Sequence, residues 1–142
     1  PFTLNYDLRQ PLGVARLLAK FHSAWNGTSR KEYSVKMIRR RDLHPDDFAA
    51  LDEEIGALRE VRLGANNHVA SLCEVYEDPD ATFLVMERID GDVLLDRLVQ
   101  KRRYTEFDAK EMVRNLLCGV KHCHDHAIAI RNLAVDNLLL AR

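Results

Sequence analysis

The pattern of apolar and polar positions over the first 40 residues predicts β-strands. Three strand-like runs cover Asn5–Val14, Leu17–Trp25 and Lys31–Ile38. Alternation with a period of two is the pattern of a strand that buries one face. Asn26-Gly27 separates the second and third runs, and Asn-Gly is a strong hairpin signal because both residues tolerate positive φ. We therefore expect these runs to form strands joined by tight turns.

A helix is predicted after the third strand. Pro45 suits a first helical position, and the acidic residues Asp46 and Asp47 suit the positive end of the helix dipole. The apolar residues that follow keep helical spacing and mark one buried stripe: Phe48, Leu51, Ile55 and Leu58. Gly64 is expected to end this helix.

The chain then returns to strands before it turns helical. Val69–Glu77 and Thr82–Arg88 are predicted to be two more strands around an Asp-Pro-Asp turn. A short helix is expected over Val93–Val99. A longer helix follows Thr105, which forms an imperfect capping box with Asp108 and precedes apolar residues at helical spacing.

The order of these elements predicts the fold class. Strands with one helix come first, helices follow, and residues 138–141 begin a final apolar strand. Such segregation is typical of an α+β fold with two lobes. We expect a β-rich lobe of five strands and one helix over residues 1–89, and part of a helical lobe over residues 90–142. At 142 residues the chain fits one domain.

Composition narrows the possible partners and location. The net charge of −1 gives no field that would favour nucleic acid or an anionic membrane, so neither is expected as a partner. No apolar run approaches the ~20 residues of a membrane span. Three cysteines without C-x-x-C spacing suit a reducing, cytoplasmic location. The chain starts at Pro1 rather than Met, and we expect it to be a piece of a longer protein.

One strand lysine and one helix carboxylate are candidates for chemistry. Lys36 lies within an apolar strand, where a lysine most often faces solvent. Stepping 100° per residue from Leu51 puts Glu54 on the flank of the apolar stripe, whereas Glu53 points to solvent. Glu54 can therefore reach inward toward Lys36, although an exposed Glu54 is also compatible with the pattern.

Residues 128–140 resemble the catalytic loop of a protein kinase, whose pattern is H-R-D-L-x-x-x-N. Arg131 and Asn137 match this pattern. Asn132 stands in place of the Asp that acts as the base, and Ala134 in place of the Lys that follows it. An Asn amide has no useful basicity. The resemblance, which extends to the calcium/calmodulin-dependent group, implies a kinase fold, and the substitutions argue against phosphoryl transfer.

The same resemblance implies a nucleotide site in the first lobe. A Lys on the third strand and a Glu on the next helix form the kinase pair, in which the Lys contacts the α and β phosphates. Met86 takes the gatekeeper position, and the backbone of Glu87 and Arg88 would face an adenine. Ser34 replaces the small apolar residue that usually covers the adenine.

The loop that should cover the phosphates departs from its pattern. Of the glycines in G-x-G-x-x-G only Gly13 remains, followed by Val14, with Ala15 and Leu18 in the other glycine positions. Leu18 adds bulk where phosphates would pass, whereas glycine permits close backbone approach. An ordinary hairpin turn over Leu12–Leu18 fits the sequence equally well.

These features predict a catalytically impaired kinase-like domain, a pseudokinase, that serves as a regulatory or protein-binding module. Its retained residues could still bind ATP, with Asn137 as a ligand for Mg²⁺. Loss of a positioned base commonly costs about 10²–10⁴ in rate. The alternatives are an active or weakly active Ser/Thr protein kinase and a decayed chain without a function. A zinc pair of His122 and His126 at i, i+4 spacing lacks a further ligand cluster.

Overall fold

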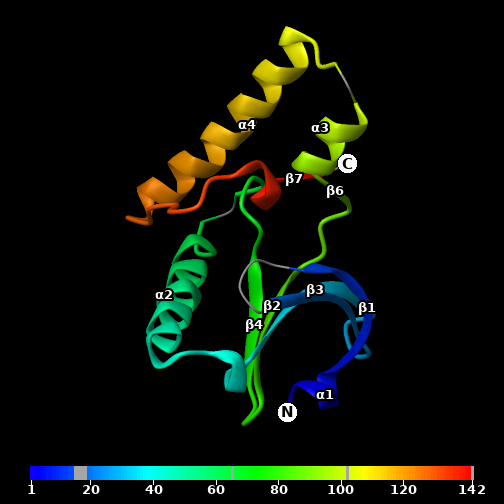
Figure 1. The fold of residues 1–142 in the computed structure, drawn as a ribbon, viewed down its shortest axis with the longest axis vertical. Helices are drawn as coiled ribbons and strands as arrows, with labels where there is room; N and C mark the ends of the chain where they lie inside the picture. The colour runs from blue at the N-terminus through cyan, green and yellow to red at the C-terminus, as the bar shows by residue number, and fades with distance from the viewer. Residues whose placement is uncertain (15–18, 65, 102, 142) are drawn as a thin grey trace. The chain divides into compact units, whose positions relative to one another are not determined.

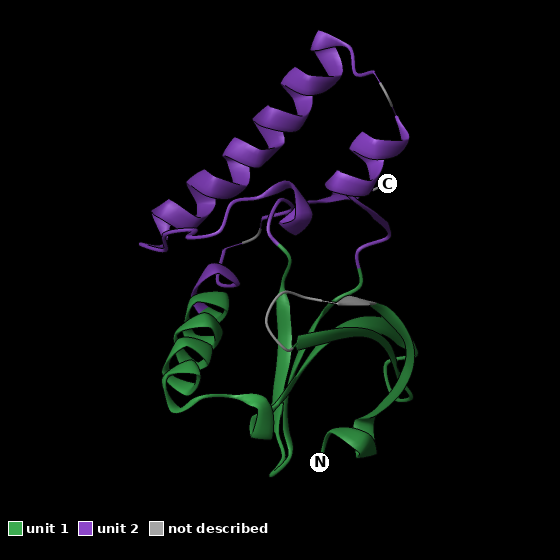
Figure 2. Ribbon diagram, in the orientation of Figure 1, with its two compact units in different colours: residues 1–59, 70–88 green, residues 60–69, 89–142 purple. Residues whose placement is uncertain are grey.

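The computed structural model describes residues 1–14, 19–64, 66–101 and 103–141. They form two compact units (Figure 2). The first unit comprises residues 1–59 and 70–88, and the second comprises residues 60–69 and 89–142. The first unit holds a five-stranded sheet and the second is mainly helical, so the predicted α+β class is confirmed.

The sheet of the first unit is antiparallel, in the order β1-β2-β3-β5-β4 (Figure 1). Its strands are β1 (Tyr6–Val14), β2 (Ala19–Asn26), β3 (Lys31–Arg39), β4 (Leu72–Glu77) and β5 (Ala81–Glu87). In the central strand β3, Lys36 lies between Phe21 on β2 and Leu84 on β5. Directly opposed residues share a face of the sheet. The side chains of these three residues are therefore on the same side.

Helix α2, Pro45–Val61, covers this side of the sheet. Leu51 and Ile55 of the helix form a buried cluster with Ile38 of β3 and Leu84 of β5. The four side chains are at most 8% exposed. Because Leu51 and Ile55 are one helical turn apart, their burial fixes which face of α2 is turned to the sheet.

The other side of the sheet is covered by the short helix α1, Phe2–Asn5 (Figure 1). Phe2 is fully buried in a second cluster that includes Val35 and Val85. Val35 immediately precedes Lys36 in β3, and alternate residues of a strand point to opposite sides. The same stretch of β3 therefore contributes to the aromatic-rich core on one side and carries Lys36 on the other.

The predicted hairpin between the second and third strands is present, but its turn works differently from the expectation. Residues 27–30 form the turn, and Arg30 has the positive φ, 53°, while Asn26 stays in β2. The Asn26 side-chain oxygen accepts hydrogen bonds from the backbone N–H groups of Thr28 and Ser29, at 3.0 and 2.8 Å. Asn26 thus favours the turn because its side chain accepts hydrogen bonds from the turn backbone, and not because its own backbone is left-handed.

Several element boundaries in the first unit differ from those expected. Asn5 belongs to α1 rather than to the first strand, α2 ends at Val61, and β4 begins at Leu72. The short helix η1 (Arg40–Asp42) was not predicted. Predictions that fall on residues 15–18 lie outside the described part of the chain.

The described part of the second unit contains two α-helices, a short 3-10 helix and a small antiparallel sheet. Its elements are β6 (Gly91–Val93), α3 (Leu94–Gln100), α4 (Glu106–Asp125), η2 (Val135–Asn137) and β7 (Leu139–Ala141). Val93 was expected to begin a helix, but residues 91–93 form a strand that pairs with β7. A Cβ atom on Gly91 would lie 1.8 Å from the carbonyl oxygen of Leu140, so only glycine allows this approach.

Helix α4 begins with the predicted capping box. The Thr105 hydroxyl accepts a hydrogen bond from the Asp108 backbone N–H at 3.0 Å, and the Asp108 carboxylate accepts one from the Thr105 backbone N–H at 3.2 Å. The bond from the Thr105 backbone is the main reason that the pKa of Asp108 lies below its ordinary value. The capping box is thus complete, with Asp in the position that Glu usually takes.

Candidate functional site

The clearest polar constellation in the first unit is the pair formed by Lys36 and Glu54. The Lys36 ammonium donates to both carboxylate oxygens of Glu54, at 2.6 and 2.9 Å. The side chain of Lys36 is 20% exposed and that of Glu54 is 43% exposed. The ammonium is therefore held in one position by two charge-assisted bonds while water still reaches the pair.

The packing of α2 explains why Glu54 rather than its neighbour meets Lys36. Glu54 directly precedes the buried Ile55 and follows the buried Leu51 by three positions. The buried stripe fixes the rotation of the helix, and the flank of that stripe lies toward the sheet. The structure thus brings Lys36 and Glu54 together, and Glu54 remains exposed while it pairs with Lys36.

Three further side chains share the sheet face of Lys36. Phe21 is directly opposite Lys36 on β2, and Ser34 is two residues before it on β3. Met86 is opposite Ser34 on β5 and is partly buried against the cluster beneath α2. No motif in the sequence singles out Phe21. Strand register could have found it, since the pairing of Asn26 with Lys31 at the hairpin also aligns Phe21 with Lys36.

Two hydrogen bonds join Glu87, at the end of β5, to Ser71, the residue before β4. The Glu87 backbone N–H donates to the Ser71 carbonyl oxygen at 3.0 Å, and the Glu87 carboxylate accepts from the Ser71 N–H at 2.8 Å. Next to it, the Arg88 guanidinium lies 3.9 Å from the Glu32 carboxylate. Because the N–H of Glu87 is already hydrogen-bonded, the Glu87 backbone could only accept a hydrogen bond from a bound base, through its carbonyl oxygen.

The predicted phosphate-covering loop is only partly described. Gly13 and Val14 close β1, with their backbones in register with Phe21 and Lys20 on β2. Gly13 on β1 is therefore opposite Phe21 on β2, and Phe21 is in turn opposite Lys36 on β3. Ala15 and Leu18, the other two positions of the glycine pattern, lie outside the described residues.

In the second unit, the residues that resemble a catalytic loop surround the short helix η2. The Asn137 side-chain amide donates to the backbone carbonyl oxygen of Asn132 at 3.0 Å. Arg131 and Asn132 are exposed, and Ala134 is half-buried. With its N–H₂ group used in this way, Asn137 can present its side-chain oxygen, the ligand type that Mg²⁺ prefers.

The two histidines considered as a zinc pair bind the backbone instead. His122 Nε2 lies 2.7 Å from the Val61 carbonyl oxygen, and His126 Nδ1 lies 2.8 Å from that of His122. The His122 ring fills the space beside Gly64, where a Cβ atom would come within 2.6 Å of it. Within the described ranges, no group of three or more His, Cys, Asp or Glu side chains is arranged to hold a metal ion.

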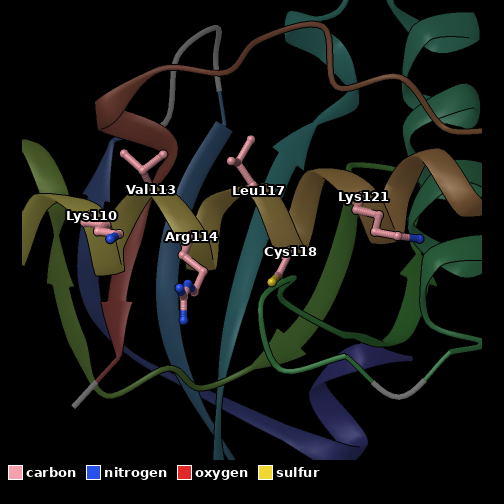
Figure 3. A pocket seen from close by; sticks show the side chains of 6 residues that line it. All are labelled: Lys110, Val113, Arg114, Leu117, Cys118 and Lys121. Atoms are coloured by element: carbon pink, nitrogen blue, oxygen red, sulfur yellow. The ribbon is translucent and has the colours of Figure 1, made fainter.

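Helix α4 carries a surface hollow whose walls come from this one helix (Figure 3). It is lined by Lys110, Val113, Arg114, Leu117, Cys118 and Lys121. Val113 is 52% exposed and Leu117 is 59% exposed, so the part of the apolar α4 stripe that lines this hollow is open. Among the described helices, none is long and apolar enough to cross a membrane.

Comparison with known proteins places this arrangement in a family. The family model described as "Protein kinase domain" matches residues 17–142. The chain is 34% identical over 135 residues to calcium/calmodulin-dependent protein kinase type 1 of Caenorhabditis elegans, covering 95% of the chain and 38% of the relative. It is 32% identical over 139 residues to calcium-dependent protein kinase 24 of Arabidopsis thaliana, covering 97% of the chain and 23% of the relative.

A third relative is myosin light chain kinase A of Dictyostelium discoideum, 31% identical over 135 residues and covered over 44% of its length. The five-stranded sheet, its single long helix and the Lys36–Glu54 pair agree with this relationship. The chain belongs to the protein kinase domain family. It spans less than half the length of each of these three relatives.

Proposed function

We propose that this chain is a catalytically impaired protein-kinase-like domain that binds ATP and acts as a regulatory or protein-binding module. One observation carries the proposal. The residues associated with nucleotide binding, Lys36 and Glu54, form a two-bond ion pair, whereas Asn132 and Ala134 replace the two residues associated with transfer. Binding and catalysis are thus separated at the level of individual side chains.

The sheet face around Lys36 supports the binding half of the proposal. An ammonium held by a carboxylate is a fixed positive charge for α and β phosphates. Phe21 and Met86 supply apolar contact on the same face, and Ser34 adds a small polar side chain between them. In the second unit, the side-chain oxygen of Asn137 would offer one ligand for a magnesium ion.

The residues at the transfer position support the impaired half. Asn132 cannot take a proton from a substrate hydroxyl, because an amide is not basic at neutral pH. Ala134 supplies no cation near a transferred phosphate, and phosphoryl transfer depends mainly on electrostatic stabilisation. These two losses reduce transfer without affecting the contacts at Lys36.

A thermal melt with and without millimolar Mg²⁺–ATP tests the proposal. A ligand at a hundred times its Kd stabilises by about 2.7 kcal/mol, which is measurable as a shift in Tm. We expect a shift that Lys36→Met abolishes. Lys20→Met is the matched control, since Lys20 is an exposed lysine beside Met37 on the other sheet face. No shift in a folded chain, or a shift that survives Lys36→Met, would sink the proposal.

Phosphate incorporation distinguishes the competing function. Since the relatives are kinases by name and the Lys36–Glu54 pair is intact, weak Ser/Thr kinase activity is the second candidate. Incorporation into a protein substrate that disappears in Lys36→Met would favour that candidate. Nucleotide binding without incorporation favours the impaired domain.

The proposed role implies a protein partner and a cytoplasmic location. Cys73, Cys118 and Cys123 form no disulfide with one another, which supports a reducing compartment. Burial raises the pKa of the Cys123 thiol, so this residue stays protonated and unreactive. Localisation of the tagged parent protein and co-purification of its partners test both points.

A further inference from the structure

An aromatic socket lies on the sheet face opposite α2, and Phe2 fills it. The Phe2 ring stacks on Phe83 with centroids 4.3 Å apart and planes 4° apart. It also stacks on Tyr6 at 5.3 Å and meets the Tyr76 ring edge-on at 5.7 Å. Phe2 is fully buried, so three rings enclose a fourth.

Apart from this ring, the segment that carries Phe2 is lightly attached. Helix α1 has only four residues and no side-chain hydrogen bond at its N-cap. Leu4 is 78% exposed. The Asn5 amide donates to the Tyr76 hydroxyl at 2.9 Å. A helix of this length is not stable by itself, so its order depends on the docking of Phe2.

The socket and Lys36 share strands β3 and β5, on opposite faces of the sheet. Phe2 packs in one cluster with Val35 of β3 and Val85 of β5, which are directly opposite each other. The next register pair on these strands is Lys36 with Leu84, whose side chains point to the other face. Withdrawal of Phe2 would leave a void against the backbone that positions Lys36.

We propose that residues 1–5 form an exchangeable strap, and that docking of Phe2 in the aromatic socket strengthens nucleotide binding at Lys36. The socket is a second binding site of the chain, and its ligand is a phenylalanine carried by a short segment. The part that concerns the nucleotide rests on the proposed function, whereas the docking does not. Because coupling between two sites is reciprocal, bound nucleotide also holds the strap more tightly.

Phe2→Ala, with Leu4→Ala as the matched control, tests the coupling. We expect Phe2→Ala to lower Tm by at least about 5 °C, as loss of a buried ring does. Well below its melt, it should weaken ATP binding several-fold and speed hydrogen exchange at the β3 amides. Leu4→Ala should leave all three unchanged. If Phe2→Ala does not fold, Phe2→Leu keeps the apolar volume but loses the stacking, and it should show smaller changes of the same sign.

A peptide added in trans tests the exchange. Acetyl-Pro-Phe-Thr-Leu-Asn-amide should restore part of the Tm and the slow β3 exchange of Phe2→Ala, whereas the same peptide with Ala for Phe should not. A Phe2→Ala chain that keeps its ATP affinity and β3 exchange refutes the coupling. A chain whose Tm the peptide does not raise refutes the exchange. If the unaltered chain binds no ATP, the proposed function fails, while the peptide and exchange measurements still decide on the socket.

Discussion

The side-chain amide of Asn137 is bonded to the main chain of Asn132, at 3.0 Å from its carbonyl oxygen. The contact spans the residues that resemble a catalytic loop, which include the short helix η2. It uses no atom of the Asn132 side chain, which is exposed. The Asn132 side chain is therefore not involved in the hydrogen bond that links positions 132 and 137.

This independence predicts that Asn132→Asp changes stability by less than about 0.5 kcal/mol, as exposed substitutions usually do. Asn137→Ala removes the donor and should cost about 1 kcal/mol. Denaturant unfolding of both variants measures the difference. Equal losses in the two variants would mean that the Asn132 side chain also supports the loop.

A double-mutant cycle on Lys36 and Glu54 should give a small coupling in the free energy of unfolding. Since the Glu54 side chain is 43% exposed, water screens the pair, and a coupling below about 1 kcal/mol is expected. Glu54→Gln should instead weaken ATP binding, because the ammonium loses its charged partner. A coupling of several kcal/mol would show that the pair acts mainly as a structural contact.

Arg30→Gly should stabilise the chain by about 0.5–1 kcal/mol. Arg30 is exposed and has a φ of 53°, a conformation that glycine adopts without strain. Gly27→Ala is the companion variant, since no atom lies within 4 Å of its added Cβ, and it should be tolerated. Chemical denaturation measures both, and a destabilised Arg30→Gly would contradict the strain at the turn.

Alkaline pH should destabilise the first unit through the aromatic socket. Burial is the main cause that raises the pKa of Tyr6 from 10.0 to about 12. The folded state favours the protonated phenol, so this contribution is complete below pH 10 and is lost as the pH rises from 10 toward 12. The hydrogen bond to Glu74 raises the pKa of Tyr76 in the same direction.

Melts of the unaltered chain and of Tyr6→Phe between pH 9 and 12 measure this effect. Tyr6→Phe keeps the ring but has no phenol to ionise, so its Tm should fall less steeply over this range. Parallel curves for the two proteins would assign the alkaline loss to other groups, such as lysines.

Periodic sequence features predicted the elements that have one buried face. The apolar stripe through Leu51 and Ile55 predicted α2 and placed Glu54 on the flank nearest the sheet. The contact between Lys36 and Glu54 agrees with that placement. Strand-like runs separated by turn signals located the five strands of the first sheet. These predictions succeeded because the burial of a single face leaves a regular trace in the sequence.

The elements that were missed depend on tertiary contacts. Helix α1 is too short for periodicity, and only the socket rings show why Phe2 is buried. Strand β6 depends on the close approach of Gly91 to Leu140, which no local pattern contains. Phe21 becomes part of the candidate site through strand register rather than through a motif.

The close approach of the His122 ring to Gly64 also limits which substitutions this sequence can accept at these two positions. The His122 ring occupies the volume that any side chain at position 64 would need, and its Nε2 meets the Val61 carbonyl oxygen. A larger residue at 64 is therefore acceptable only together with a smaller one at 122, which would forfeit that hydrogen bond. The two positions are expected to covary among descendants of this chain, and a swap at either one alone should be selected against.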